Sequence, residues 1–139
     1  LESDDAWQKW LKLQRIRIFD DDVRLLLPRL PDASIGRVFL LFPDPWPKTR
    51  HHKRRFIAPE GLDHLARIMT PGAELRFASD DDSYVRWTLW HVTRHPAFTW
   101  DARGPADWRT RPADAVATRY ETKAVAAGRR PAYLTFRRR

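Results

Sequence analysis

Apolar and polar positions alternate in blocks through the middle of the chain. Residues 37–42 are nearly all apolar, which predicts a strand covered on both faces. Residues 74–77 predict another strand, and residues 80–94 carry apolar side chains at helical spacing. Alternating strands and helices indicate an α/β sheet with parallel strands.

Weaker patterns flank this central block. Residues 30–34 predict a turn, and residues 103–117 predict a polar connection without periodicity. The other expected elements are a helix at residues 1–14, a strand at 16–19, a short helix at 23–27, a helix from residue 59 to about residue 69, and strands at 98–100 and 132–136.

Acidic residues follow three of the predicted strands. They are the cluster at residues 20–22, Asp44, and the cluster at residues 80–82. Ligands of α/β sheets gather beyond the carboxyl ends of the strands, so these acids are candidate site residues. For residues 80–82 the alternative is a helix N-cap, with acids that favour the helix dipole.

Composition narrows the class of protein. A chain of 139 residues fits a single domain, and its net charge of +8 indicates a polyanionic partner such as nucleic acid. The absence of cysteine excludes disulfides and Cys-ligated zinc, and it fits a cytoplasmic location. No apolar run approaches the roughly 20 residues needed to span a bilayer, so no membrane partner is expected.

The most informative segment spans residues 42–55 and has the sequence FPDPWPKTRHHKRR. Asp44 lies between two prolines, which restrict its backbone and aim its side chain; the alternative is a turn with a capping aspartate. The cationic residues that follow can neutralise phosphates, or they form a solvated basic loop. His51 and His52 lack suitably spaced further ligands, so no metal site is expected.

This segment resembles the FPDPWxKxRHxKRR sequence of the tRNA (guanine-N7)-methyltransferase family. Residues 77–84, FASDDDSY, resemble the family's FxTDxxxY, with Ser79 in the usual threonine place. Residues 118–123, TRYETK, resemble its TxYExK, and residues 128–129 with 133–136 resemble its ending. The resemblance covers nearly all of the chain from Ile16 onward.

The resemblance implies an enzyme that methylates guanine N7 in the variable loop of tRNA, with S-adenosylmethionine as donor. The implied fold is the Rossmann-like class I methyltransferase fold. Asp44 takes the catalytic position and also borders the donor, whose adenine side is bound by Asp21, although Asp20 and Asp22 are close alternatives. Substrate-contacting positions are Lys48, Asp80, Thr118, Arg119, Tyr120 and Glu121, and RNA-contacting positions are Arg50, His51, His52, Lys53, Arg54 and Arg55.

The chemistry of the reaction agrees with these roles. Guanine N7 already carries a lone pair, so the transfer needs positioning more than a strong base. Carboxylates stabilise the positive charge that develops on the ring, and Asp80 or Glu121 can accept hydrogen bonds from guanine N–H groups. Glu121 is otherwise a solvated helix charge. Trp46 is expected to pack under its loop, and the alternative is stacking on the target base.

One feature of such folds is missing from the sequence. The five glycines are dispersed, so the first strands and the glycine-rich turn that approaches the donor do not occur in it. Residues 1–139 are therefore expected to form one partial methyltransferase domain that is unstable alone or self-associates. The alternatives are a catalytically inactive RNA-binding module that retains the basic loop, and an amino-group methyltransferase with a similar acidic-proline loop.

Overall fold

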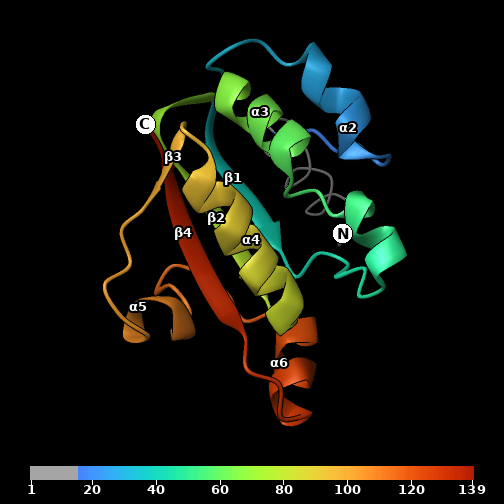
Figure 1. The fold of residues 1–139 in the computed structure, drawn as a ribbon, viewed down its shortest axis with the longest axis vertical. Helices are drawn as coiled ribbons and strands as arrows, with labels where there is room; N and C mark the ends of the chain where they lie inside the picture. Colours follow the sequence, from blue (N-terminus) through green and yellow to red (C-terminus); the bar gives the residue numbers. More distant parts are fainter. Residues whose placement is uncertain (1–15) are drawn as a thin grey trace, which may run out of the picture.

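The computed structural model of the chain describes residues 16–139, which form a four-stranded sheet with the two longest helices on one face (Figure 1). The strands lie in the order β1-β2-β4-β3. Their bounds are Ile35–Leu41 for β1, Met69–Ser79 for β2, Phe98–Trp100 for β3 and Ala132–Arg138 for β4. The expected α/β class is confirmed, and the four central and C-terminal strands were all predicted.

The strand directions decide where the ends of the strands meet. β1 runs parallel to β2, as expected for strands joined by a helix, but β4 runs antiparallel to both β2 and β3. The prediction of a parallel sheet is therefore wrong for β4. Ser79 at the end of β2 pairs with Ala132 at the start of β4. The carboxyl ends of β1 and β2 consequently share one edge of the sheet with the amino end of β4.

Two long helices connect the central strands. Helix α3, Pro59–Ile68, joins β1 to β2 and begins at its proline, as predicted. Helix α4, Asp82–Arg94, joins β2 to β3. The shorter helices are α2 at Val23–Leu26, η1 at Leu27–Arg29, η2 at Thr49–Arg54, α5 at Ala106–Arg109 and α6 at Arg119–Ala126.

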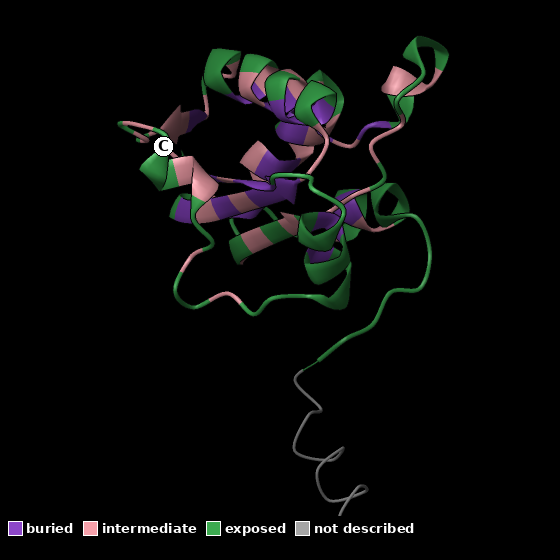
Figure 2. Cartoon of the chain, turned by 90° about the horizontal axis from the view of Figure 1, so that it is seen from below, coloured by how far each residue is buried: buried purple, intermediate pink, exposed green. Residues whose placement is uncertain are grey.

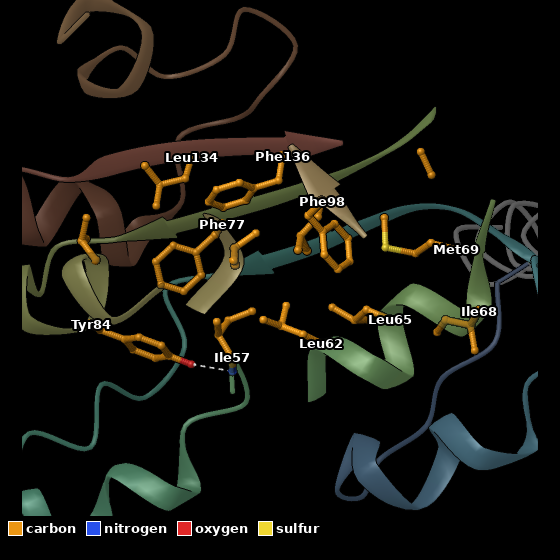
Figure 3. Close-up of a cluster of buried hydrophobic side chains, with 14 of the residues drawn as sticks. Ile57, Leu62, Leu65, Ile68, Met69, Phe77, Tyr84, Phe98, Leu134 and Phe136 are labelled. Carbon is orange, nitrogen blue, oxygen red and sulfur yellow. Dashed lines mark hydrogen bonds between the residues drawn. The ribbon is translucent and has the colours of Figure 1, made fainter. Parts of the chain in front are cut away.

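The core lies between the sheet and helices α3 and α4 (Figure 3). Leu62 and Leu65 of α3 pack toward Phe77 and Phe136 of the sheet, and each of these four side chains is at most 2% exposed. Tyr84 of α4 closes one end of this layer, where its hydroxyl accepts a hydrogen bond from the backbone N–H of Ile57 at 3.5 Å. The helical spacing of the apolar residues in α3 thus produces the face that the sequence predicted.

The opposite face of the sheet is more open (Figure 2). Phe39 and Leu41 of β1 are 50% and 51% exposed, so the prediction of a strand covered on both faces is wrong. Within residues 16–139, β1 is an edge strand, and the helix layer covers only the face that carries Val38 and Leu40.

The first described residues differ from expectation. Residues 16–19 form no strand, and Ile18 is 89% exposed. The sheet of the described residues consists of β1, β2, β4 and β3, and residues 16–19 are not part of it. The helix predicted at residues 1–14 lies outside the described residues. No helix in the described part is long and apolar enough to cross a membrane.

Candidate active site

Asp44 lies on a tight turn that follows β1. Phe42 and Trp46 on either side have φ values of 49° and 42°, a left-handed conformation that is uncommon for residues other than glycine. The backbone N–H of Phe42 donates to the Ala78 carbonyl at 2.7 Å, which ties the turn to β2. The Asp44 side chain is exposed, and its Oδ1 accepts a hydrogen bond from the Trp46 N–H at 3.1 Å. The turn therefore presents a carboxylate in a fixed orientation.

Asp80 lies at the carboxyl end of β2, close to this turn. Arg129 donates through Nε to its Oδ2 at 2.5 Å, and the Tyr120 hydroxyl donates to its Oδ1 at 3.3 Å. The Tyr120 ring also packs against Phe42, with 5.5 Å between ring centroids. Asp80, Tyr120 and the Asp44 turn are therefore neighbours, although Tyr120 is 40 residues from Asp80 in sequence.

The acidic cluster at residues 80–82 divides into two roles. Asp81 is the N-cap of α4 and accepts a hydrogen bond from the Tyr84 N–H at 2.8 Å. Asp82 is exposed in the first helical turn, whereas the Asp80 carboxylate faces Arg129 and Tyr120. The capping alternative is thus correct for Asp81, and Asp80 belongs to the candidate site.

Glu121 is buried in α6, at 3% exposure, so the alternative of a solvated helix charge is wrong. Thr118 is the N-cap of this helix and accepts a hydrogen bond from the Glu121 N–H at 3.1 Å. The Glu121 carboxylate itself accepts hydrogen bonds from Arg111 Nε, at 3.0 Å, and from the Tyr133 hydroxyl. Burial alone opposes ionisation, but these hydrogen bonds and the Arg111 charge hold the pKa of Glu121 below its ordinary value.

A cavity of about 450 Å³ opens beside Glu121, a size within the range of small-molecule sites. One wall is apolar and comes from β1 and its turn, through Phe39, Leu41 and Phe42. The polar groups of the lining include Arg76, Arg111, Asp114, Thr118, Glu121 and Tyr133. The cavity therefore lies between Phe42, at the start of the Asp44 turn, and the start of α6.

Tyr133 and Glu121 are expected to make the stability of the protein pH-dependent. Burial and the hydrogen bond to Glu121 raise the pKa of Tyr133 to about 12, so its stabilising effect is present below about pH 10 and is lost as the pH rises toward 12. The lowered pKa of Glu121 gives the opposite dependence, with stabilisation above about pH 4.3 that is lost in acid. We expect Tyr133→Phe to flatten the alkaline loss of unfolding free energy and Glu121→Gln to flatten the acid loss, as measured by urea denaturation across pH. Parallel curves for a variant and the wild type would contradict this.

The basic segment after Asp44 forms the 3-10 helix η2. Lys48, Arg50, Lys53 and Arg54 are exposed, while His51 and His52 are half-buried. The His51 ring and the Arg54 guanidinium both contact the Trp46 ring, at 5.9 Å and 4.9 Å between centres. These contacts favour packing within the loop as the role of Trp46.

Arg55 differs from its charged neighbours because it is 1% exposed. Its Nε donates to the Pro45 carbonyl at 2.8 Å, and its Nη2 donates to Ser83 Oγ at 3.1 Å. A side chain enclosed in this way does not reach phosphates, so the prediction of an RNA contact is wrong for Arg55. Its place directly before the Phe56–Ile57 pair that enters the core is the signal that could have indicated burial.

The remaining predicted residues lie at the surface. Asp21 is exposed and accepts a hydrogen bond from the Asp22 N–H at 2.7 Å, while Asp22 caps α2. Asp20, Lys48 and Arg119 are exposed as well. The structure does not test their roles, which stay predictions. Across residues 16–139, no three His, Cys, Asp or Glu side chains gather where they could hold a metal ion.

Comparison with known proteins identifies the family. A family model described as "Putative methyltransferase" matches residues 3–134. The chain belongs to this methyltransferase family. It is 63% identical over 127 residues to the tRNA (guanine-N(7)-)-methyltransferase of Rhodospirillum rubrum, covering 91% of this chain and 50% of that protein. Proteins with the same name from Paramagnetospirillum magneticum and Mesorhizobium japonicum are 58% and 54% identical, with 89% and 91% of this chain and 51% and 54% of their own lengths covered.

These comparisons confirm the family expected from the motifs of the sequence. This methyltransferase chain spans about half the length of the curated relatives that it matches. The comparisons do not test the roles of individual residues or the extent of the domain at residues 1–139, and both stay predictions.

Proposed function

We propose that this protein transfers a methyl group from S-adenosylmethionine to guanine N7 in the variable loop of tRNA. The observation that carries the proposal is the meeting of the Asp44 turn with Asp80, Tyr120 and Glu121 at one edge of the sheet. In α/β sheets this edge is where substrates bind. The shared name of the relatives supplies the reaction and the substrate.

The reaction places few demands on acid–base chemistry. The N7 lone pair forms the bond to the methyl carbon as the sulfur–carbon bond of the donor breaks, and no proton leaves the ring. The sulfonium of the donor supplies an electrophilic methyl group when it is bound. Asp44 is exposed and oriented by the Trp46 N–H, so its carboxylate is suited to stabilise the charge that develops on the guanine ring.

The described residues fit only part of a donor site. Asp44 follows β1 and Asp21 precedes α2, and both side chains are exposed, which supports a role for them in donor binding. The glycines of the described residues form no glycine-rich turn at the end of a strand. Gly61 instead allows the helix backbone to lie close to the backbone of Phe56. We infer that Asp44 and Asp21 contribute to donor binding together with groups outside the described residues.

Guanine recognition is assigned to two acidic groups, Glu121 in the cavity lining and Asp80 at the end of β2. Asp80 and Glu121 are acceptors suited to the guanine N1–H and N2–H groups, and the lowered pKa of Glu121 keeps it ionised near neutral pH. Each already accepts two hydrogen bonds, and a carboxylate has about four acceptor positions. Thr118, Arg119, Tyr120 and Lys48 complete the proposed substrate contacts.

The exposed cations of η2 form the proposed tRNA surface. Arg50, Lys53 and Arg54 are exposed on one short helix directly after the Asp44 turn, with His51 and His52 beside them. Such a cluster holds a phosphate backbone without reading its sequence, which suits a substrate that is recognised by shape. Arg55 is left out of this surface because it is buried.

The test is methyl transfer from labelled S-adenosylmethionine to unmodified tRNA by the intact protein, with identification of the product nucleoside. We expect 7-methylguanosine, and none from a matched transcript with adenosine in place of the variable-loop guanosine. An N2-methylated guanosine would instead indicate the amino-group methyltransferase. Binding of tRNA without any transfer would indicate the RNA-binding module.

A further inference from the structure

The buried side chain of Arg55 links the Asp44 turn to helix α4. Its guanidinium stacks over the rings of Tyr84 and Trp87, with 4.9 Å and 5.2 Å to the ring centroids, and Nη2 donates to Ser83. All three partners belong to α4. Burial lowers the pKa of Arg55, and the nearby Asp81 carboxylate partly compensates. Burying a charge costs free energy, and here hydrogen bonds and aromatic rings offset that cost. A charge that is buried and provided with partners in this way indicates a specific role for the guanidinium.

The other side of the guanidinium reaches the turn. Nε of Arg55 donates to the Pro45 carbonyl at 2.8 Å. That carbonyl belongs to the same peptide group as the Trp46 N–H, which donates to Asp44 Oδ1 at 3.1 Å. One planar peptide unit thus connects Arg55 to the Asp44 carboxylate, and the planarity of the unit couples the direction of its N–H to that of its C=O.

The turn needs such a restraint. Trp46 has a φ of 42°, and a residue other than glycine holds that conformation only when its surroundings impose it. The hydrogen bond from Arg55 to the Pro45 carbonyl holds the Pro45–Trp46 peptide group on the side that faces the core. A lysine in this place keeps the charge but lacks the planar fork that reaches Pro45 and Ser83 together.

We propose that Arg55 is a positioning residue, which orients the Asp44 carboxylate through the Pro45–Trp46 peptide. This inference rests on the proposed function for its effect on catalysis. It assigns Arg55 to the geometry of the reacting site, in contrast to the exposed cations of η2 that face the tRNA.

The first test compares Arg55→Lys with Arg67→Lys in the intact protein. Arg67 is a matched control, because it also donates to two backbone carbonyls, those of Leu27 and Leu30, but lies outside the proposed site. We expect Arg55→Lys to lower kcat roughly 100-fold with little change in KM for tRNA, as misplacement of a reacting group does. Arg67→Lys should lower stability but leave kcat unchanged. Equal kcat values for Arg55→Lys and the wild type would overturn the proposal.

The second test needs no activity. Hydrogen exchange of the Trp46 amide reports its hydrogen bond to Asp44, and we expect it to be about tenfold faster in Arg55→Lys and also faster in Ser83→Ala. Ser83 is exposed, so its replacement keeps the fold even if Arg55→Lys does not fold. Unchanged exchange in Ser83→Ala and Arg55→Lys would overturn the positioning role. A wild-type protein that forms no 7-methylguanosine would refute the proposed function instead, while this measurement would still decide the inference.

Discussion

Replacement of Asp44 by alanine is expected to slow methyl transfer by a factor of roughly 100 to 1,000 and to leave the affinity for tRNA nearly unchanged. The carboxylate is exposed and held by the Trp46 N–H, whereas the exposed cations of the proposed tRNA surface lie on η2. The variant therefore loses stabilisation of the charged ring without losing phosphate contacts. Single-turnover transfer and tRNA binding, measured at the same salt concentration, separate the two effects.

Two further variants give this experiment its controls. Asp82→Ala removes an exposed acid that lies outside the proposed site, and it should leave transfer unchanged. Asp44→Asn keeps an oxygen that accepts from Trp46 but removes the charge. If Asn restores transfer, the role of Asp44 is to shape the turn; if Asn is as slow as Ala, the charge itself acts on the substrate. Parallel loss of binding and transfer in Asp44→Ala would contradict a catalytic role.

Local pattern was sufficient for the elements that build the core. The apolar spacing of α3, the short apolar runs of β2 and β4, and the N-terminal proline of α3 all act within a few residues. Which strands pair, and which face of a strand is covered, depend on distant parts of the chain. The direction of β4 and the open face of β1 are set by which segments lie beside these strands.

The candidate site shows the same division. The motifs pointed to Asp44, Asp80 and Glu121, and the structure brings all three to one edge of the sheet. The motifs gave no sign that Glu121 is buried with Arg111 and Tyr133, because those contacts form only when the fold brings these distant residues together. Arg111 lies in a connection without periodicity, and no signal in the sequence could have identified it.

A methyl group added at Gly61 is expected to destabilise the protein by about 2 kcal/mol, although alanine is normally the better residue in a helix. A Cβ at this position of α3 would lie 2.2 Å from the carbonyl oxygen of Phe56, far inside the contact distance. The obstructing atom belongs to the backbone, so no side-chain rotation relieves the overlap. Helix propensity favours alanine by roughly 1 kcal/mol, which is too little to offset the strain. Urea denaturation of Gly61→Ala measures the net effect.

The displacement should also reach the candidate site, because Phe56 directly follows Arg55. Ile57 is fully buried, and its backbone is hydrogen-bonded to the side chains of Tyr84 and Trp87. Since these two rings also contact the Arg55 guanidinium, a shift of residues 56–57 would move the partners of Arg55. Gly61→Ala should therefore lower kcat even well below its unfolding temperature. Gly104→Ala is the matched control, since a Cβ there has no atom within 4 Å and should change neither stability nor kcat. If Gly61→Ala is as stable as the wild type, the backbone at Phe56 can move away from the added methyl group. That result would contradict the idea that the packing of α3 against Phe56 helps to hold the Asp44 turn.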